Sequence, residues 1–182
     1  LSEPLPEMTS RDYEAAGDRY FGQQDYAMAF LHYDKALESA LDNSRILYKQ
    51  GLLFLVTEQF REAAAYFANV IDVDPNHAAA HEGLGTAYFK LRDYEKAEPQ
   101  FREAVGLSPR LWRSRNYMGN IYDFRKDYDQ AASQYAAAIM IRPNDSNLYN
   151  NLGVSLHLAG RHDESVNAFK KALNAEGDKA KV

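Results

Sequence analysis

The sequence predicts an all-α solenoid of five tandem helix pairs, and three observations support this fold class. Pro75, Pro109 and Pro143 are spaced by 34 residues. Dividing the chain at this period gives five segments without insertion or deletion: 10–43, 44–77, 78–111, 112–145 and 146–179. The eighth position of every segment is glycine, so one column holds half of the ten glycines in the chain. A fixed period of this length is the signature of repeat proteins, in which neighbouring units stack to bury a continuous core.

Four further columns complete the repeat. Position 8 reads Gly17, Gly51, Gly85, Gly119 and Gly153, and position 11 reads Tyr20, Phe54, Tyr88, Tyr122 and Leu156. Positions 20, 24 and 27 read Ala29, Ala63, Ala97, Ala131 and Ser165; Tyr33, Phe67, Phe101, Tyr135 and Phe169; and Ala36, Val70, Ala104, Ala138 and Ala172. The spacings 8–11 and 20–24–27 are steps along one face of a helix. Small residues at positions 8 and 20 allow two helices to approach closely, and the aromatic residues fill the space beside that contact.

Each segment therefore begins with one helix, turns, and ends with a second. The predicted turns are at Asp25-Tyr26, Asp93-Tyr94 and Asp127-Tyr128. Proline at position 32 is expected to end the second helix, because proline lacks a backbone donor and disfavours helix in the residue before it.

These columns resemble the tetratricopeptide repeat family over residues 10–179. The third segment carries the family pattern as His81-x2-Leu84-Gly85-x2-Tyr88, then Ala97-x3-Phe101-x2-Ala104 and Pro109. The resemblance implies a right-handed superhelical solenoid of antiparallel helix pairs. It also implies that the first helix of each pair lines a concave groove that binds a segment of another protein.

The ends of the chain depart from the repeat. Residues 1–9, with Pro4 and Pro6, are expected to form an extended tail. Residues 180–182 follow the last repeat, where family members often have a capping helix. Either the polar second helix of repeat 5 acts as the cap or the chain is truncated, and truncation is the favoured interpretation.

Composition limits the possible functions. A net charge of −5 argues against nucleic-acid binding, which needs a concentrated basic face. The absence of cysteine excludes disulfides and thiolate sites, and no stretch is long and apolar enough to span a membrane. His77 and His81 lie four residues apart, but no third ligand follows, so no metal or other cofactor is expected. No catalytic constellation is apparent, and the compartment, cytoplasmic or bacterial periplasmic, stays open.

The resemblance places the groove at positions 2, 5, 6, 9, 12 and 13 of each repeat. The predicted partner-binding residues are Phe21, Tyr48, Leu55, Phe89, Arg113, Asn116, Tyr117, Asn120, Phe124, Asn147, Asn150 and Asn151. Leu52 and Val56 belong either to the groove or to the core. The predicted groove is thus apolar toward the N-terminus and rich in asparagine toward the C-terminus, where amides can pair with the backbone of an extended peptide.

The sequence predicts a protein-interaction scaffold that binds a peptide or helical segment of a partner. A clamp for acidic chaperone tails is disfavoured, because Glu14 and Asp18 stand where that clamp has lysine and asparagine. Two alternatives stay open. The chain is an assembly or targeting subunit, for example of a bacterial pilus or secretion lipoprotein type, that self-associates through its C-terminal helix. Otherwise it is the regulatory part of a longer enzyme.

Overall fold

The computed structural model describes residues 8–38 and 43–179, and these residues form ten helices and no strand. The helices are α1 (Ser10–Gly22), α2 (Tyr26–Glu38), α3 (Ser44–Val56), α4 (Phe60–Val73), α5 (Ala78–Lys90), α6 (Tyr94–Leu107), α7 (Trp112–Phe124), α8 (Tyr128–Ile141), α9 (Ser146–Leu158) and α10 (His162–Lys179). The all-α solenoid fold is confirmed. Of the expected N-terminal tail only Met8 and Thr9 lie among the described residues, and the end at 180–182 lies outside them.

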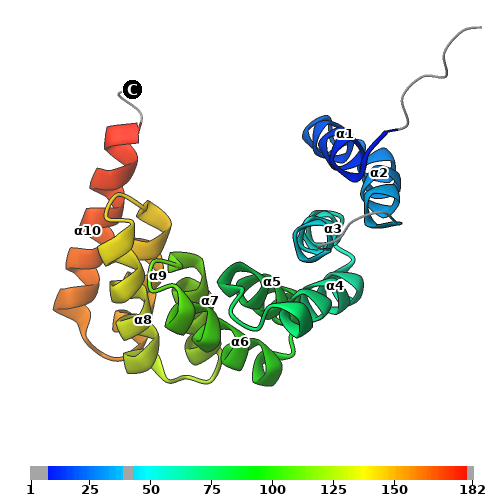
Figure 1. Ribbon diagram of the computed structural model, residues 1–182. Helices are drawn as coiled ribbons and strands as arrows, with labels where there is room; N and C mark the ends of the chain where they lie inside the picture. The colour runs from blue at the N-terminus through cyan, green and yellow to red at the C-terminus, as the bar shows by residue number, and fades with distance from the viewer. Residues whose placement is uncertain (1–7, 39–42, 180–182) are drawn as a thin grey trace, which may run out of the picture. The chain divides into compact units, whose positions relative to one another are not determined.

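The chain divides into two compact units. The N-terminal unit (Leu1–Leu91) contains α1 to α5, and the C-terminal unit (Arg92–Val182) contains α6 to α10. Within each unit, helices that follow one another in the chain pack side by side, as Figure 1 shows.

Close approach within a pair depends on the glycine column. A Cβ atom added at Gly17 would lie 2.5 Å from the ring of Tyr33, and one added at Gly153 would lie 2.7 Å from the ring of Phe169. Gly51 and Gly119 meet Phe67 and Tyr135 in the same way. The rings of position 24 thus pack directly on the backbone of the first helix, and Phe67 is fully buried.

Position 20 adds to this contact. Ala29, Ala63, Ala97 and Ala131 have no exposed surface. Ser165, which replaces alanine in repeat 5, is 2% exposed, and its hydroxyl donates a hydrogen bond of 2.7 Å to the carbonyl of Gly153. The substitution therefore keeps the helices close and satisfies its own buried polar group.

The turn inside each pair is a backbone feature that the columns did not indicate. Position 15 has a positive φ in all five repeats, at Gln24, Glu58, Arg92, Lys126 and Gly160. In repeats 1, 2, 4 and 5 the next amide donates to the carbonyl of position 11, for example Gln59 N to Phe54 O at 2.8 Å. This left-handed ending with a 6→1 hydrogen bond is a Schellman motif. Only repeat 5 has the glycine that such a conformation favours.

The Asp-Tyr pairs have a clear role in these turns. Asp93 caps α6 by accepting a hydrogen bond of 3.2 Å from the amide of Lys96, and Asp127 caps α8 in the same way. The acidic residue satisfies an otherwise unpaired donor of the new helix. Helices α4, α6 and α8 each end two residues before their proline, as predicted.

Gln50 interrupts the core of the N-terminal unit. In the other repeats its position holds Ala16, Leu84, Met118 and Leu152. Its side chain is fully buried, and neither amide atom has a hydrogen-bond partner among the described residues. An unsatisfied buried polar group of this kind costs about 1–3 kcal/mol, so α3 carries a local destabilising element.

The turn conformation leads to a prediction. We expect Gly160→Ala to lower the free energy of unfolding by about 1–2 kcal/mol, because the residue has φ +79°. Gly106→Ala is a control in the last turn of α6, where the backbone is helical, and is expected to raise stability by up to about 1 kcal/mol. Neither added Cβ meets an atom within 4 Å, so the two changes differ in backbone conformation alone. Urea denaturation of both variants measures this, and equal stability would contradict the assignment.

Candidate functional site

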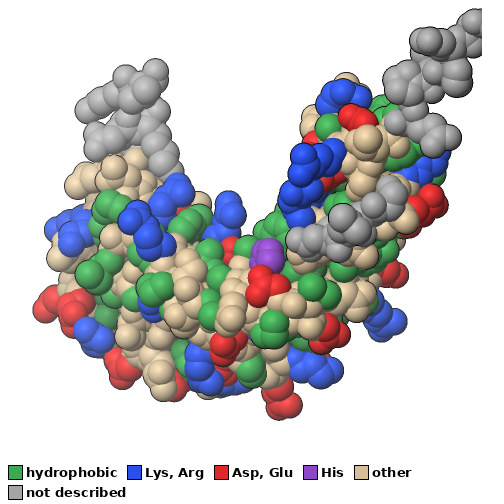
Figure 2. Space-filling view, in the orientation of Figure 1, with side chains coloured by type: hydrophobic (Ala, Val, Ile, Leu, Met, Phe, Trp, Pro, Cys, Tyr) green, Lys and Arg blue, Asp and Glu red, His purple; other side chains and the backbone are tan. Residues whose placement is uncertain are grey.

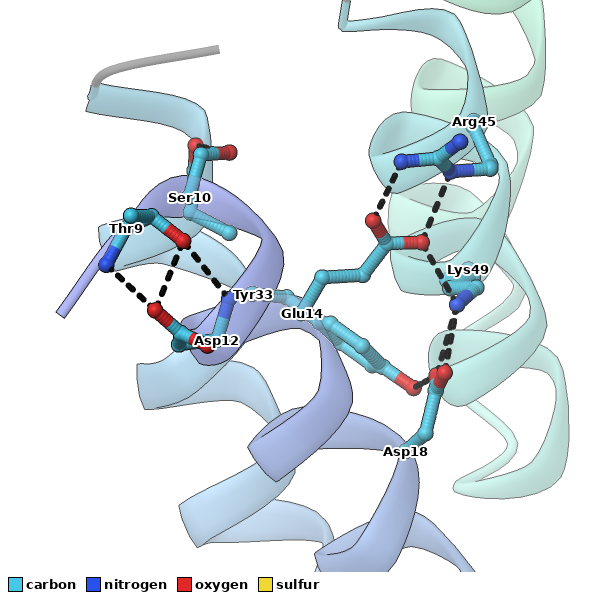
Figure 3. Close-up of polar contacts among 9 residues, drawn as sticks. Thr9, Ser10, Asp12, Glu14, Asp18, Tyr33, Arg45 and Lys49 are labelled. Carbon is cyan, nitrogen blue, oxygen red and sulfur yellow. Dashed lines mark hydrogen bonds and ion pairs between the residues drawn. The ribbon is translucent and has the colours of Figure 1, made fainter.

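The wall formed by α1 and α3 in the N-terminal unit is an ion-pair network (Figure 3). Arg45 Nε donates to Glu14 Oε1 at 2.8 Å, and Arg45 Nη2 lies 2.5 Å from Oε2. Lys49 Nζ lies 2.7 Å from Glu14 and 2.7 Å from Asp18. Tyr33 donates its hydroxyl to Asp18 at 2.8 Å. The carboxylates that replace the lysine and asparagine of the chaperone-tail clamp, Glu14 and Asp18, are therefore already paired with cations of the next repeat.

Burial and hydrogen bonding shift the pKa values of two groups in this network, Glu14 and Tyr33. Burial alone would raise the pKa of Glu14, whose side chain is 9% exposed, but the hydrogen bonds from Arg45 and Lys49 outweigh it. The pKa of Glu14 consequently lies below its ordinary value. Burial, followed by the adjacent Asp18 carboxylate, raises the pKa of the Tyr33 hydroxyl.

The apolar residues predicted for this unit lie largely against its cores. Phe21 is half-buried and makes an edge contact with Tyr26 at 5.6 Å between ring centroids. The ring of Tyr48 packs on those of Phe67 and His77, with ring centroids 5.6 Å and 5.1 Å apart. Leu52 and Leu55 also pack against the cluster around Phe67.

Two apolar positions of this unit remain. Phe89 is half-buried, whereas Val56 is 51% exposed. Of the two residues left open between groove and core, Leu52 thus joins the core and Val56 the surface.

The corresponding wall of the C-terminal unit, formed by α7 and α9, is built from amides. Asn151 Nδ2 donates to Asn116 Oδ1 at 3.0 Å. The hydroxyl of Tyr135 lies 2.6 Å from Asn120 Oδ1 and 2.8 Å from Asp123 Oδ2. Burial, followed by the Asp123 carboxylate, raises the pKa of Tyr135.

The two walls share one geometry. Position 5 of one repeat meets position 6 of the next, as Glu14 with Lys49 and as Asn116 with Asn151. Position 9 likewise meets the tyrosine hydroxyl of position 24, as Asp18 with Tyr33 and as Asn120 with Tyr135. Full charges occupy these positions in the N-terminal unit, and amides occupy most of them in the C-terminal unit.

Asn147 and Asn150 complete the asparagine cluster. Both are exposed, and both line a pocket of 410 Å³ between α9 and α10. The pocket is lined by Ser146, Asn147, Asn150, Phe169, Ala172 and Leu173. In the part of the chain that the structure describes, the side chains of Asn147 and Asn150 have no hydrogen-bond partner, so their donors and acceptors are open to a ligand.

The other predicted residues of the C-terminal unit surround this wall. Arg113 is exposed, and its guanidinium lies 5.3 Å from the ring of Trp112, whose ring is also 5.1 Å from Arg142. The ring of Tyr117 stacks on that of Phe101, with centroids 5.1 Å apart. Phe124 is 66% exposed, and its ring centroid lies 4.7 Å from that of Tyr94. Hydrophobic side chains appear as separate patches among charged and polar ones in Figure 2.

Sequence reasoning missed a buried carboxylate in the C-terminal unit. Glu98 is 7% exposed, and it accepts hydrogen bonds from Arg102, Arg125 and Tyr122. Burial raises its pKa and these partners lower it, with a net depression. Glu98 occupies a position that is Ala64 in repeat 2 and Ala132 in repeat 4, and this departure was the available signal.

Neither a three-ligand metal site nor a membrane-spanning helix is found among the described residues. Among the described residues, no group of three or more His, Asp or Glu side chains has the geometry to hold a metal ion. His77 Nδ1 accepts from the amide of Ala80, and His81 Nε2 lies 3.0 Å from the carbonyl of Pro75. No helix within residues 8–38 and 43–179 is long and apolar enough to cross a membrane.

The ion-pair network leads to a prediction about pH. Because the pKa of Glu14 is lower in the folded chain than the ordinary glutamate value of 4.5, its contribution to stability is present above pH 4.5 and is lost as the pH falls through the folded value. We expect Glu14→Gln to lower the free energy of unfolding at pH 7 by about 1–3 kcal/mol, as for a hydrogen bond to a charged group. The difference should shrink toward pH 3.

Urea denaturation across this pH range measures the effect. Glu103→Gln, at an exposed position of α6, is the control and should change stability by less than about 0.5 kcal/mol. A Glu14→Gln deficit that is equal at pH 7 and pH 3 would contradict the role of the charge.

Comparison with known proteins identifies the family. The family model described as tetratricopeptide repeat matches residues 48–111 and 118–180. A crystal structure of MamA is 28% identical, with a TM-score of 0.84 over 91% of this chain and 97% of that one. MamA from Desulfovibrio magneticus RS-1 is 19% identical, with a TM-score of 0.84 over 93% and 96%. YrrB, described as a TPR protein with an unusual peptide-binding site, is 24% identical, with a TM-score of 0.75 over 93% and 87%.

No curated protein sequence matches the chain significantly. The family match nevertheless covers well over half of its residues, and consecutive helices within each compact unit pack against one another as the family requires. The chain therefore belongs to the tetratricopeptide repeat family and is a protein-interaction scaffold of that class.

Proposed function

We propose that the α7–α9 wall of the C-terminal unit binds an extended peptide segment of a partner protein through its amide side chains. The observation that carries this proposal is the set of amides with unused hydrogen-bonding capacity. Asn147 and Asn150 are exposed. The side chains of Asn116 and Asn151 share one hydrogen bond, although each amide is able to form several.

Extended peptide backbone is the ligand that suits this wall. A peptide presents an N–H donor and a C=O acceptor at every residue, and an asparagine amide offers one group of each kind. Recognition of this sort depends on backbone rather than on side chains, so the wall accepts varied sequences. Arg113, an exposed residue of α7 that lies over the Trp112 ring, adds a cation to the same helix and favours a ligand that carries a carboxylate.

The α1–α3 wall supports this choice by contrast. Its charged groups are bound to one another, so a ligand there would have to break ion pairs around Glu14, a mostly buried carboxylate. Loss of a partner by a buried charge is costly, and the amide wall carries no such penalty.

The test uses exposed residues that have no structural bond. Peptides are selected from a random extended library with the purified chain, and their affinities are measured by fluorescence anisotropy. We expect Asn147→Ala combined with Asn150→Ala to weaken binding by at least about tenfold, the equivalent of one or two hydrogen bonds. Asn144→Ala, an exposed asparagine in the loop before α9, is the matched control and should leave affinity unchanged.

A second measurement addresses the backbone directly. Methylation of single backbone nitrogens in a selected peptide removes one donor at a time without changing its side chains. At least one position should lose affinity to a similar extent in the wild-type chain and less in the double variant. Equal affinity of the double variant and wild type for every selected peptide would refute the proposal.

Self-association through α10 is a second candidate, and a specific observation favours it. In the N-terminal unit, Phe67 packs against Gly83 of the following repeat, where an added Cβ would lie 2.5 Å from the ring. The equivalent ring of Phe169 instead lines the pocket between α9 and α10. Val166 and Leu173 on α10 are 52% and 68% exposed. A second copy of the chain would bury this apolar surface.

Sedimentation velocity at micromolar concentration tests this candidate. We expect the wild-type chain to sediment as a dimer and Leu173→Lys to shift it to a monomer, because a charge at a buried apolar contact is unfavourable. Met140→Lys, at an 86% exposed position of α8, is the control and should leave the dimer intact. A monomeric wild-type chain would exclude the candidate.

A further inference from the structure

A buried glutamine lies in the interface between the first two repeats of the N-terminal unit. Ile46, Gln50 and Leu53 follow one another along one face of α3 at helical spacing. Ile46 and Leu53 are 1% and 3% exposed, and both belong to the cluster that contains Tyr33 of α2. Gln50 is fully buried on the same face, and neither of its amide atoms has a hydrogen-bond partner among the described residues. The face of α3 that meets repeat 1 thus contains an unsatisfied polar group.

The next interface of the same unit is apolar at the equivalent position. The corresponding face of α5 is formed by Ala80, Leu84 and Ala87, with Leu84 in the place of Gln50. These residues share one apolar cluster with Phe67 and Val70 of α4. A buried leucine adds to stability, whereas an unpaired buried amide lowers it. We therefore expect repeat 1 to be bound to repeat 2 less tightly than repeat 2 is bound to repeat 3.

Charged groups connect α1 to α3 beside this face. Glu14 is paired with Arg45 and Lys49, and Lys49 is also paired with Asp18 (Figure 3). The side chains of Arg45 and Asp18 are 63% and 49% exposed. Pairs that involve exposed charges contribute little to stability, and salt screens them. The attachment of repeat 1 is therefore expected to weaken as the ionic strength rises.

Separate contacts hold the two helices of repeat 1 together. The ring of Tyr33 packs on the backbone at Gly17, where an added Cβ would lie 2.5 Å away, and its hydroxyl donates to Asp18 at 2.8 Å. The hydroxyl of Ser10 donates a hydrogen bond of 2.7 Å to the carbonyl of Ala36. These contacts join α1 to α2 without involving repeat 2, so the pair is able to move as one body.

We propose that repeat 1 is a detachable cap of the N-terminal unit: α1 and α2 separate together from α3, while α3 to α5 stay folded. Separation uncovers the apolar face of Ile46 and Leu53. It also removes the carboxylates of Glu14 and Asp18 from Lys49. The open state thus exposes an apolar face beside a cation, and the weakest interface of the unit controls access to both.

Hydrogen exchange of the full chain, followed by mass spectrometry, tests this proposal. We expect the amides of α1 and α2 to exchange faster than those of α4 and α5, and at least about twofold faster in about 0.5 M than in about 0.05 M sodium chloride. Gln50→Leu removes the unsatisfied amide and should slow the exchange of α1 and α2 by at least about fivefold. Lys49→Gln removes two ion pairs and should accelerate it by about twofold at low salt and by less at high salt.

Gln134→Leu is the matched control. This glutamine of α8 also has a buried amide oxygen without a partner among the described residues, but it lies in the C-terminal unit, so the exchange of α1 and α2 should not change. Circular dichroism checks that each variant keeps its helices. Fraying caused by the end position alone would not respond to Gln50→Leu. Equal exchange of α1–α2 and α4–α5, equal rates in Gln50→Leu and wild type, or no response to salt and to Lys49→Gln would overturn the proposal.

Discussion

The contact between a glycine on the first helix and an aromatic ring on the second is the constraint on which four of the helix pairs depend. In four of the repeats a Cβ atom at the glycine would lie within 2.7 Å of the ring, so no other residue fits without moving a buried side chain. This contact sets both the distance between the two helices and their rotation about their axes. The Schellman turn then closes the pair, and its left-handed residue is accepted at four positions without glycine.

The rotation of the two helices about their axes also determines which positions of the first helix reach the surface. Because the glycine faces the partner helix, positions 5, 6 and 9 are carried to one wall in both units, where position 5 meets position 6 of the following repeat. The geometry of that wall is thus inherited from the core, whereas its chemistry is free to differ. Glu14 and Lys49 occupy it in one unit, and Asn116 and Asn151 occupy it in the other.

This division also explains what the sequence could predict. Gly17 and Tyr33 belong to columns of fixed spacing, so the helix pairs were readable from the period alone. The left-handed turn was not, because Gln24, Glu58, Arg92 and Lys126 show no shared residue type. The packing of Tyr48 and Leu52 was not readable either, because position within a repeat does not state how far a long side chain reaches into the neighbouring core. The pairing of Glu14 with Arg45 joins residues 31 positions apart and needed the packed structure.

The two walls differ in what they leave for a partner. In the N-terminal unit each carboxylate of the wall is already bound to a cation of the chain, so the network stabilises the packing of α1 against α3 and has little capacity left. In the C-terminal unit the bond between Asn116 and Asn151 consumes one donor and one acceptor, and Asn147 and Asn150 add exposed amides that line the pocket between α9 and α10. A neutral amide also loses less on leaving water than a charge does, so a peptide can bind there at a lower desolvation cost. The same backbone geometry therefore gives one wall that holds repeats together and another with the free amides on which the proposed peptide binding rests.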